Sequence, residues 1–106
     1  MPILFDQGTP GPLREFLNPH QVETAFERGW STLSNGELLA VGEQEGFEVF
    51  VTTDRNLRDQ QNLGRGNIAI AVLSSTSWPR IQKAVTAVKQ ANDTALPGSF
   101  KEVDIP

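Results

Sequence analysis

Several features that define common classes of protein are missing from this sequence of 106 residues. It contains no cysteine, which excludes disulfide bonds and thiolate chemistry and is typical of a reducing compartment. No apolar run approaches the roughly 20 residues that a membrane-spanning helix needs, so we expect no membrane-embedded segment. The first residues, Met1–Asp6, lack the basic region and the long apolar stretch of a signal peptide. Together these absences predict a cytoplasmic protein.

An excess of basic residues is also missing, since the formal net charge is −4. Binding of nucleic acid by bulk electrostatics usually needs a basic surface, because neutralisation of the phosphates drives it. Arg55, Arg58 and Arg65 form the only tight basic cluster. They either contact phosphate groups or lie solvated in a helix and loop, and the sequence leaves both interpretations open.

Two further kinds of catalytic motif are absent. Gly8 and Gly11 fit neither a P-loop nor a dinucleotide-binding fingerprint, so no glycine-rich phosphate loop is present. The single histidine, His20, follows a proline and has no evident acidic or nucleophilic partner in the sequence. We therefore expect His20 to serve packing or to lie at the surface rather than to take part in catalysis.

What the sequence does contain is an alternation of strand and helix patterns. Continuous apolar runs such as Ile68–Leu73 are typical of strands that are buried on both faces. Ser34 and Glu37 have the spacing of a capping box, which marks the start of a helix that ends at Gly46. We expect strands over residues 3–5, 21–25, 47–51 and 68–73, and helices over residues 12–17, 34–46, 56–61 and from 78 to about 96.

This order predicts a single α/β domain over residues 1–106 with three layers. Its mostly parallel sheet has four strands and helices on both faces, and the extended or partly disordered tail, residues 97–106, adds a fifth strand if it pairs. Right-handed crossovers make the strand order 2-1-3-4 the simplest. The winding direction then reverses between the first and third strands, and ligands of open α/β sheets bind at the carboxyl ends of the strands there.

Acidic residues follow both strands at this switch point. Asp6 directly follows the first strand and Asp54 follows the third after two threonines, while Glu37, Asn56 and Asp59 can reach the same edge. Oxygen donors of this kind suit Mg²⁺ or Mn²⁺, which would relieve the repulsion between the carboxylates and prepare a phosphodiester for attack by water. A structural role is the alternative for each acid: Asp6 holds its loop, Asp54 caps a helix and Glu37 completes the capping box.

Three segments make the chain resemble the PIN-like domain over residues 2–90: Ile3-Leu4-Phe5-Asp6, Glu37-Leu38-Leu39 in a helix after Gly29-Trp30, and Val51-Thr52-Thr53-Asp54-Arg55-Asn56-Leu57. More narrowly, the chain is similar to the short PIN-like proteins predicted to be the toxin nucleases of bacterial toxin–antitoxin pairs. The resemblance implies metal-dependent hydrolysis of RNA, with Asp6, Glu37 and Asp54 catalytic and Asn56 as a further ligand to Mg²⁺ or Mn²⁺. It also implies an antitoxin, encoded nearby, as the partner. Candidate contacts to the RNA are Arg55, Arg58 and Ser74.

Two departures from the PIN-like pattern keep other functions open. Asn56 stands where a fourth acid is usual and Gln7 where a glutamate is common, which fits a catalytically inactive PIN-like module that binds a partner. A receiver-type phospho-signalling domain is a third hypothesis, with Asp54 as the phosphoacceptor. Receiver domains normally carry a lysine after their fifth strand, and this chain lacks it, since Lys101 lies in the tail. The sequence leaves open whether the chain forms a homodimer.

Overall fold

A computed structural model of the chain describes residues 1–57 and 66–106. Five strands form one sheet in which every pair is parallel: β1 (Pro2–Phe5), β2 (Gln21–Thr24), β3 (Val49–Thr52), β4 (Ala69–Leu73) and β5 (Phe100–Val103). Their order is β2-β1-β3-β4-β5. The expected 2-1-3-4 arrangement is therefore confirmed, and the C-terminal residues supply a fifth strand beside β4.

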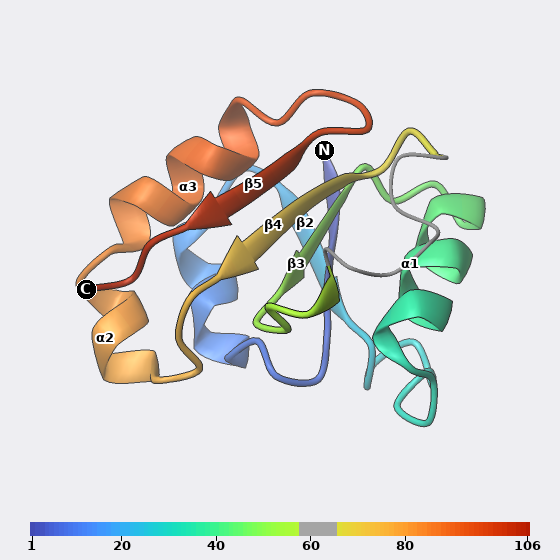
Figure 1. The fold of residues 1–106 in the computed structure, drawn as a ribbon, viewed down its shortest axis with the longest axis horizontal. Helices are drawn as coiled ribbons and strands as arrows, with labels where there is room; N and C mark the ends of the chain where they lie inside the picture. Colours follow the sequence, from blue (N-terminus) through green and yellow to red (C-terminus); the bar gives the residue numbers. More distant parts are fainter. Residues whose placement is uncertain (58–65) are drawn as a thin grey trace.

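Helices cover both faces of this sheet, which confirms the three-layer α/β architecture (Figure 1). The α-helix α1 (Asn35–Gln44) lies on one face, and the 3₁₀ helix η1 (Gly11–Phe16) lies on the other with α2 (Trp78–Gln82) and α3 (Val85–Asp93). Among the helices in residues 1–57 and 66–106, none is long and apolar enough to cross a membrane.

The continuous apolar runs of the strands are explained by burial on both faces. Side chains alternate between the two faces of a strand, so each run feeds two cores. In β1, Ile3 and Phe5 pack into the core beneath η1, α2 and α3, whereas Leu4 packs into the core beneath α1. All three side chains are fully buried.

The start and end of α1 follow from local sequence. The Ser34 hydroxyl accepts a hydrogen bond from the Glu37 N–H, and the Glu37 carboxylate accepts one from the Ser34 N–H, which confirms the predicted capping box. Beyond the last turn, Gly46 has a φ of +89°, a left-handed conformation that glycine adopts without steric cost.

Two of the expected helices differ from the prediction. The segment after Pro12 forms a 3₁₀ helix of six residues rather than an α-helix, and no side chain caps its start. The expected long helix after Trp78 is broken between α2 and α3, where Ala84 leaves the helical conformation and its N–H bonds to the carbonyl of Ile81 in a tightened turn. Ile81 and Val88, on either side of the break, are both buried against the sheet. The helix expected over 56–61 lies mostly outside the described residues.

Candidate functional site

Asp6 lies at the carboxyl end of β1, directly beside the end of β3. Its N–H donates a hydrogen bond of 3.1 Å to the carbonyl of Val51, which continues the β1–β3 pairing by one residue. Its carboxylate is buried, with the residue only 4% exposed, and it accepts hydrogen bonds of 2.6 Å from the hydroxyls of Thr9 and Thr52. Asp6 is thus fixed by partners from its own loop and from the neighbouring strand.

Asp54 is held in the turn that follows β3. One carboxylate oxygen accepts a 3.0 Å hydrogen bond from the N–H of Asn56, and the Asp54 carbonyl accepts one from Leu57. The other carboxylate oxygen accepts a 3.1 Å hydrogen bond from the side-chain amide of Asn35. The residue is only partly buried, so Asp54 is more accessible than Asp6.

Thr52 joins the two aspartates. Its hydroxyl donates to the Asp6 carboxylate at 2.6 Å and accepts the N–H of Asp54 at 3.0 Å. The carboxylate of Asp6 and the backbone N–H of Asp54, which lies 48 positions further along the chain, therefore both contact one hydroxyl group at the switch point of the sheet.

The loop after β1 closes tightly over this edge. A Cβ atom added at Gly8 would lie 2.5 Å from the hydroxyl oxygen of Thr53, closer than carbon and oxygen can pack. At Gly11, by contrast, an added Cβ would meet no atom within 4 Å. The close approach at Gly8 is a consequence of the tertiary fold, because Thr53 belongs to the segment after β3.

The Glu37 carboxylate makes its hydrogen bond away from Asp6 and Asp54. Glu37 is exposed, and its carboxylate accepts the Ser34 N–H at 2.9 Å in the capping box of α1. This hydrogen bond, followed by that with the Ser34 hydroxyl, lowers the pKa of Glu37. The α1 residue that reaches Asp54 is Asn35, which brings an uncharged amide where the sequence suggested a third acid.

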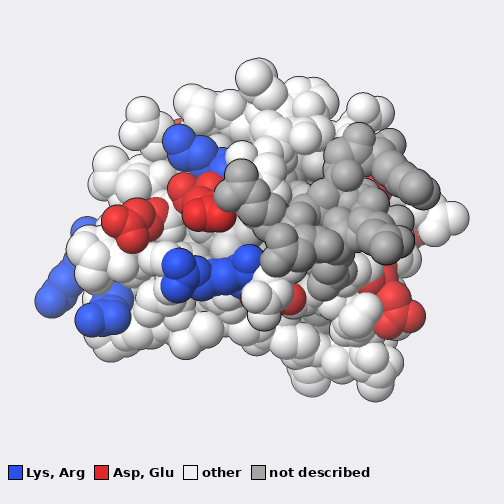
Figure 2. Space-filling view, in the orientation of Figure 1, with Lys and Arg blue, Asp and Glu red and all other residues white. Residues whose placement is uncertain are grey.

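The candidate substrate contacts have different surroundings. Arg55 is exposed and lines, with Ser74, a hollow of about 240 Å³ at the carboxyl ends of β4 and β5. Ser74 is also engaged with the chain end, since its hydroxyl oxygen accepts the N–H of Ile105 at 2.7 Å. Figure 2 shows basic and acidic side chains mixed over the described part of the face that carries β5, without a broad basic area among them. Arg58, Asp59 and Arg65 lie outside the described residues.

The prediction for His20 needs a correction. It has an acidic partner, because its Nε2 atom lies 2.5 Å from the Asp93 carboxylate on α3, and Lys89 pairs with the same carboxylate. The hydrogen bond with Lys89, and next that with His20, lowers the pKa of Asp93. This group lies near the start of β2, at the opposite end of the strands from Asp6.

The donors around Asp6 and Asp54 fit a magnesium or manganese ion only in part. Within residues 1–57 and 66–106, no group of three or more histidine, cysteine, aspartate or glutamate side chains could hold a metal ion. The two carboxylates, however, are hard oxygen donors, and each of their oxygens keeps a second lone pair. Mg²⁺ is often bound by one or two carboxylates that are completed by water and substrate phosphates. The edge fits a cation with few protein ligands, not a closed cage.

Thr9, Thr52 and Asn35 were missed as site residues in the sequence. Thr52 carried a sequence signal, because it is the polar residue that ends the apolar run Val49-Phe50-Val51, and the structure buries it fully. The position after β5 also bears on the receiver hypothesis. It is occupied by Asp104, whereas Lys101 lies within the strand in register with Ala71.

Comparisons with protein-family models, with curated proteins and with solved structures found no match to this chain. The PIN-like resemblance therefore depends on the sequence segments alone.

Proposed function

We propose that this protein is a Mg²⁺- or Mn²⁺-dependent ribonuclease of the PIN-like kind and the toxin of a toxin–antitoxin pair. The single observation that supports the activity is the contact of Asp6 and Asp54 with one hydroxyl group at the switch point of the sheet. The two aspartates at this edge would supply the negative charge that holds a divalent cation, and the cation would in turn attract the anionic phosphodiester. Cytoplasmic localisation, RNA as substrate, an antitoxin partner and a homodimer belong to the same proposal.

The chain's own residues take different roles in this activity. Asp54, the more accessible acid, would hold the cation, and buried Asp6 would add charge behind it. Arg55 follows Asp54 directly and is exposed, so its guanidinium can pair with a phosphate of the RNA backbone. The cation, when bound, would polarise the phosphodiester and lower the pKa of a bound water.

The test is cleavage of a fluorescently labelled single-stranded RNA in the presence of Mg²⁺ or Mn²⁺. Asp54→Asn should lower the rate roughly 100-fold or more, because it removes the accessible charge at the site. Glu37→Gln is the matched control: it also removes one acid from the same edge, yet the capping box occupies that side chain. Cleavage that survives both chelation and the double change Asp6→Asn/Asp54→Asn would exclude the proposal.

A second candidate, a catalytically inactive PIN-like module, is favoured by the hydrogen bonds of the two aspartates. Each carboxylate oxygen already accepts a hydrogen bond from Thr9, Thr52, Asn35 or Asn56. In this second candidate, the hydrogen bonds serve only to hold the loops after β1 and β3 together. In that case Asp54→Asn lowers the melting temperature, and calorimetry detects no Mn²⁺ binding.

Asn35→Asp separates the two candidates further. The change replaces a hydrogen-bond donor to Asp54 by a third carboxylate, so repulsion should lower the melting temperature without a divalent cation. If the edge binds a cation, added Mn²⁺ should raise the melting temperature of this variant more than that of the unchanged protein. An equal response of both proteins to Mn²⁺ would favour the inactive module.

A further inference from the structure

A second hollow lies at the amino edge of the sheet, away from Asp6 and Asp54. It has a volume of about 560 Å³, and its lining residues come from the segments that enter four strands. Met1 precedes β1, Glu48 precedes β3, Ile68 precedes β4, and Leu96 lies in the turn before β5. The volume is within the range of roughly 300–1,000 Å³ that is typical of ligand sites.

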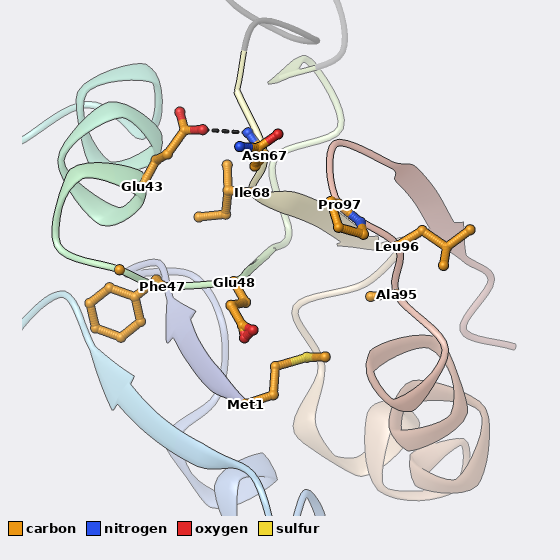
Figure 3. Close-up of a pocket in the computed structure, with 10 residues that line it drawn as sticks. Met1, Glu43, Phe47, Glu48, Asn67, Ile68, Ala95, Leu96 and Pro97 are labelled. Atoms are coloured by element: carbon orange, nitrogen blue, oxygen red, sulfur yellow. Dashed lines mark hydrogen bonds between the residues drawn. The ribbon is translucent and has the colours of Figure 1, made fainter.

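The floor of this hollow is apolar, and its rim exposes apolar side chains to solvent. Phe47 and Ile68 are each only 5% exposed and form part of the core beneath α1. Leu96 and Met1, in contrast, are 69% and 40% exposed. Figure 3 shows Phe47 on one side of the hollow and Leu96 on the other, with Met1 and Glu48 between them. A partner could therefore bury the side chains of Met1 and Leu96 without rearranging the core.

The charged side chains that line the hollow are acidic, and Met1, which also lines it, carries the cationic α-amino group. The acidic side chains are Glu43 and Glu48, and no lysine or arginine is among the described residues that line the hollow. Glu43 accepts the N–H of Asn67, as Figure 3 shows. Glu48 is exposed, and its carboxylate has no partner among residues 1–57 and 66–106. An accessible carboxylate thus lies next to exposed aliphatic surface.

We propose that this hollow binds a segment of another protein that carries aliphatic side chains beside a lysine or arginine. Long cationic side chains suit such a surface, because their methylene stem packs on apolar groups while the charged end reaches an acid. The stem and the neighbouring aliphatic side chains cover Met1 and Leu96, and the cationic end pairs with Glu48. This inference is independent of nuclease activity at the opposite edge.

Charge complementarity favours a basic protein segment over other partners. Nucleic acid presents phosphates, and the cytoplasmic surface of membranes carries anionic lipids, so Glu43 and Glu48 would repel both. A basic and aliphatic peptide gains from the two carboxylates and also buries the exposed side chain of Leu96.

The experiment is selection of a displayed library of random peptides on the immobilised full-length protein, followed by calorimetry with the most enriched peptide in synthetic form. We expect enriched peptides to combine lysine or arginine with leucine, isoleucine or valine. Glu48→Lys and Leu96→Asp should each weaken binding about tenfold or more, which corresponds to about 1.4 kcal/mol. Both side chains are exposed, and circular dichroism melts establish that the variants are folded.

Matched controls distinguish this hollow from general stickiness. Glu15→Lys makes the same charge change at an exposed site on η1, and Phe26→Asp removes a 75% exposed apolar side chain from the loop after β2. Both controls should bind the peptide as the unchanged protein does. The inference is wrong if no peptide is enriched, if the enriched peptides lack basic residues, or if the controls weaken binding as much as Glu48→Lys and Leu96→Asp.

Discussion

Replacement of Thr52 by valine removes one hydroxyl from the centre of the carboxyl edge and keeps the branched shape of the side chain. Thr52 is fully buried, so water cannot replace the lost partner. The change leaves a buried oxygen of Asp6 without its 2.6 Å donor and the N–H of Asp54 without its 3.0 Å acceptor. It therefore tests whether the link between the two aspartates contributes to stability.

The size of the effect follows from these two hydrogen bonds. A hydrogen bond to a charged group contributes about 1.5–3 kcal/mol and a neutral one about 0.5–1.5 kcal/mol. We therefore expect Thr52→Val to lower the free energy of unfolding by about 2–4 kcal/mol, a large share of the roughly 5–15 kcal/mol that is typical of a domain. Thr52→Ser keeps the hydroxyl and loses one buried methyl group, which should cost only about 1 kcal/mol.

Urea denaturation measures this difference as a shift of the midpoint at constant slope. Thr53→Val is the matched control, because Thr53 is adjacent, half-buried and without a hydrogen bond from its hydroxyl to any described residue. It should change the midpoint little. If Thr52→Val lies within about 0.5 kcal/mol of the unchanged protein, or if Thr52→Ser is equally destabilised, the proposed link is refuted.

Two further predictions concern the loops around the site. Gly8→Ala should lower the melting temperature, because its Cβ would lie 2.5 Å from the Thr53 hydroxyl oxygen and the Thr53 side chain would have to rotate away, whereas Gly11→Ala has open space. The expected cost is about 1 kcal/mol, and equal melting temperatures of the two variants would contradict the tight closure. Hydrogen bonds, first from Arg14 and then from the Thr24 backbone, lower the pKa of Glu27 from 4.5 to about 2. Because the pKa of Glu27 is lower in the folded than in the unfolded state, this carboxylate stabilises the fold at pH values above its unfolded pKa. The contribution should disappear as the pH falls from 4.5 to about 2. Glu27→Gln should therefore flatten this part of the curve of stability against pH.

Much of the architecture could be predicted because its signals are local. The apolar runs of β1, β3 and β4 are long enough to require burial on both faces, and alternation with helices then favours a parallel sheet. The capping box of α1 and Gly46 after its end were recognised from a few neighbouring residues. The division of the last helix was not recognised, because the apolar spacing of Ile81 and Val88 is the same in one helix or two.

The candidate site, like the fold, could be predicted from the sequence only in part. The carboxyl ends of β1 and β3 follow from the strand order, so the proximity of Asp6 and Asp54 could be expected. The contact of Asn35 with Asp54 could not, because it depends on how the start of α1 is set against the turn after β3. The spacing of Glu37 suited both a ligand and a capping residue, and only the contacts of its carboxylate show which atoms it reaches.

The sequence by itself determined four of the five strands and where α1 begins and ends, because side-chain alternation and capping act over a few residues, but it left the pairing of β5 open. Only the tertiary structure decided that Thr52 joins Asp6 to Asp54, that Asn35 reaches that pair, and that Glu48 and Leu96 share a hollow at the opposite edge. These contacts join residues far apart in the chain. Their distances are fixed by the packing of whole elements against the sheet, which no local pattern specifies.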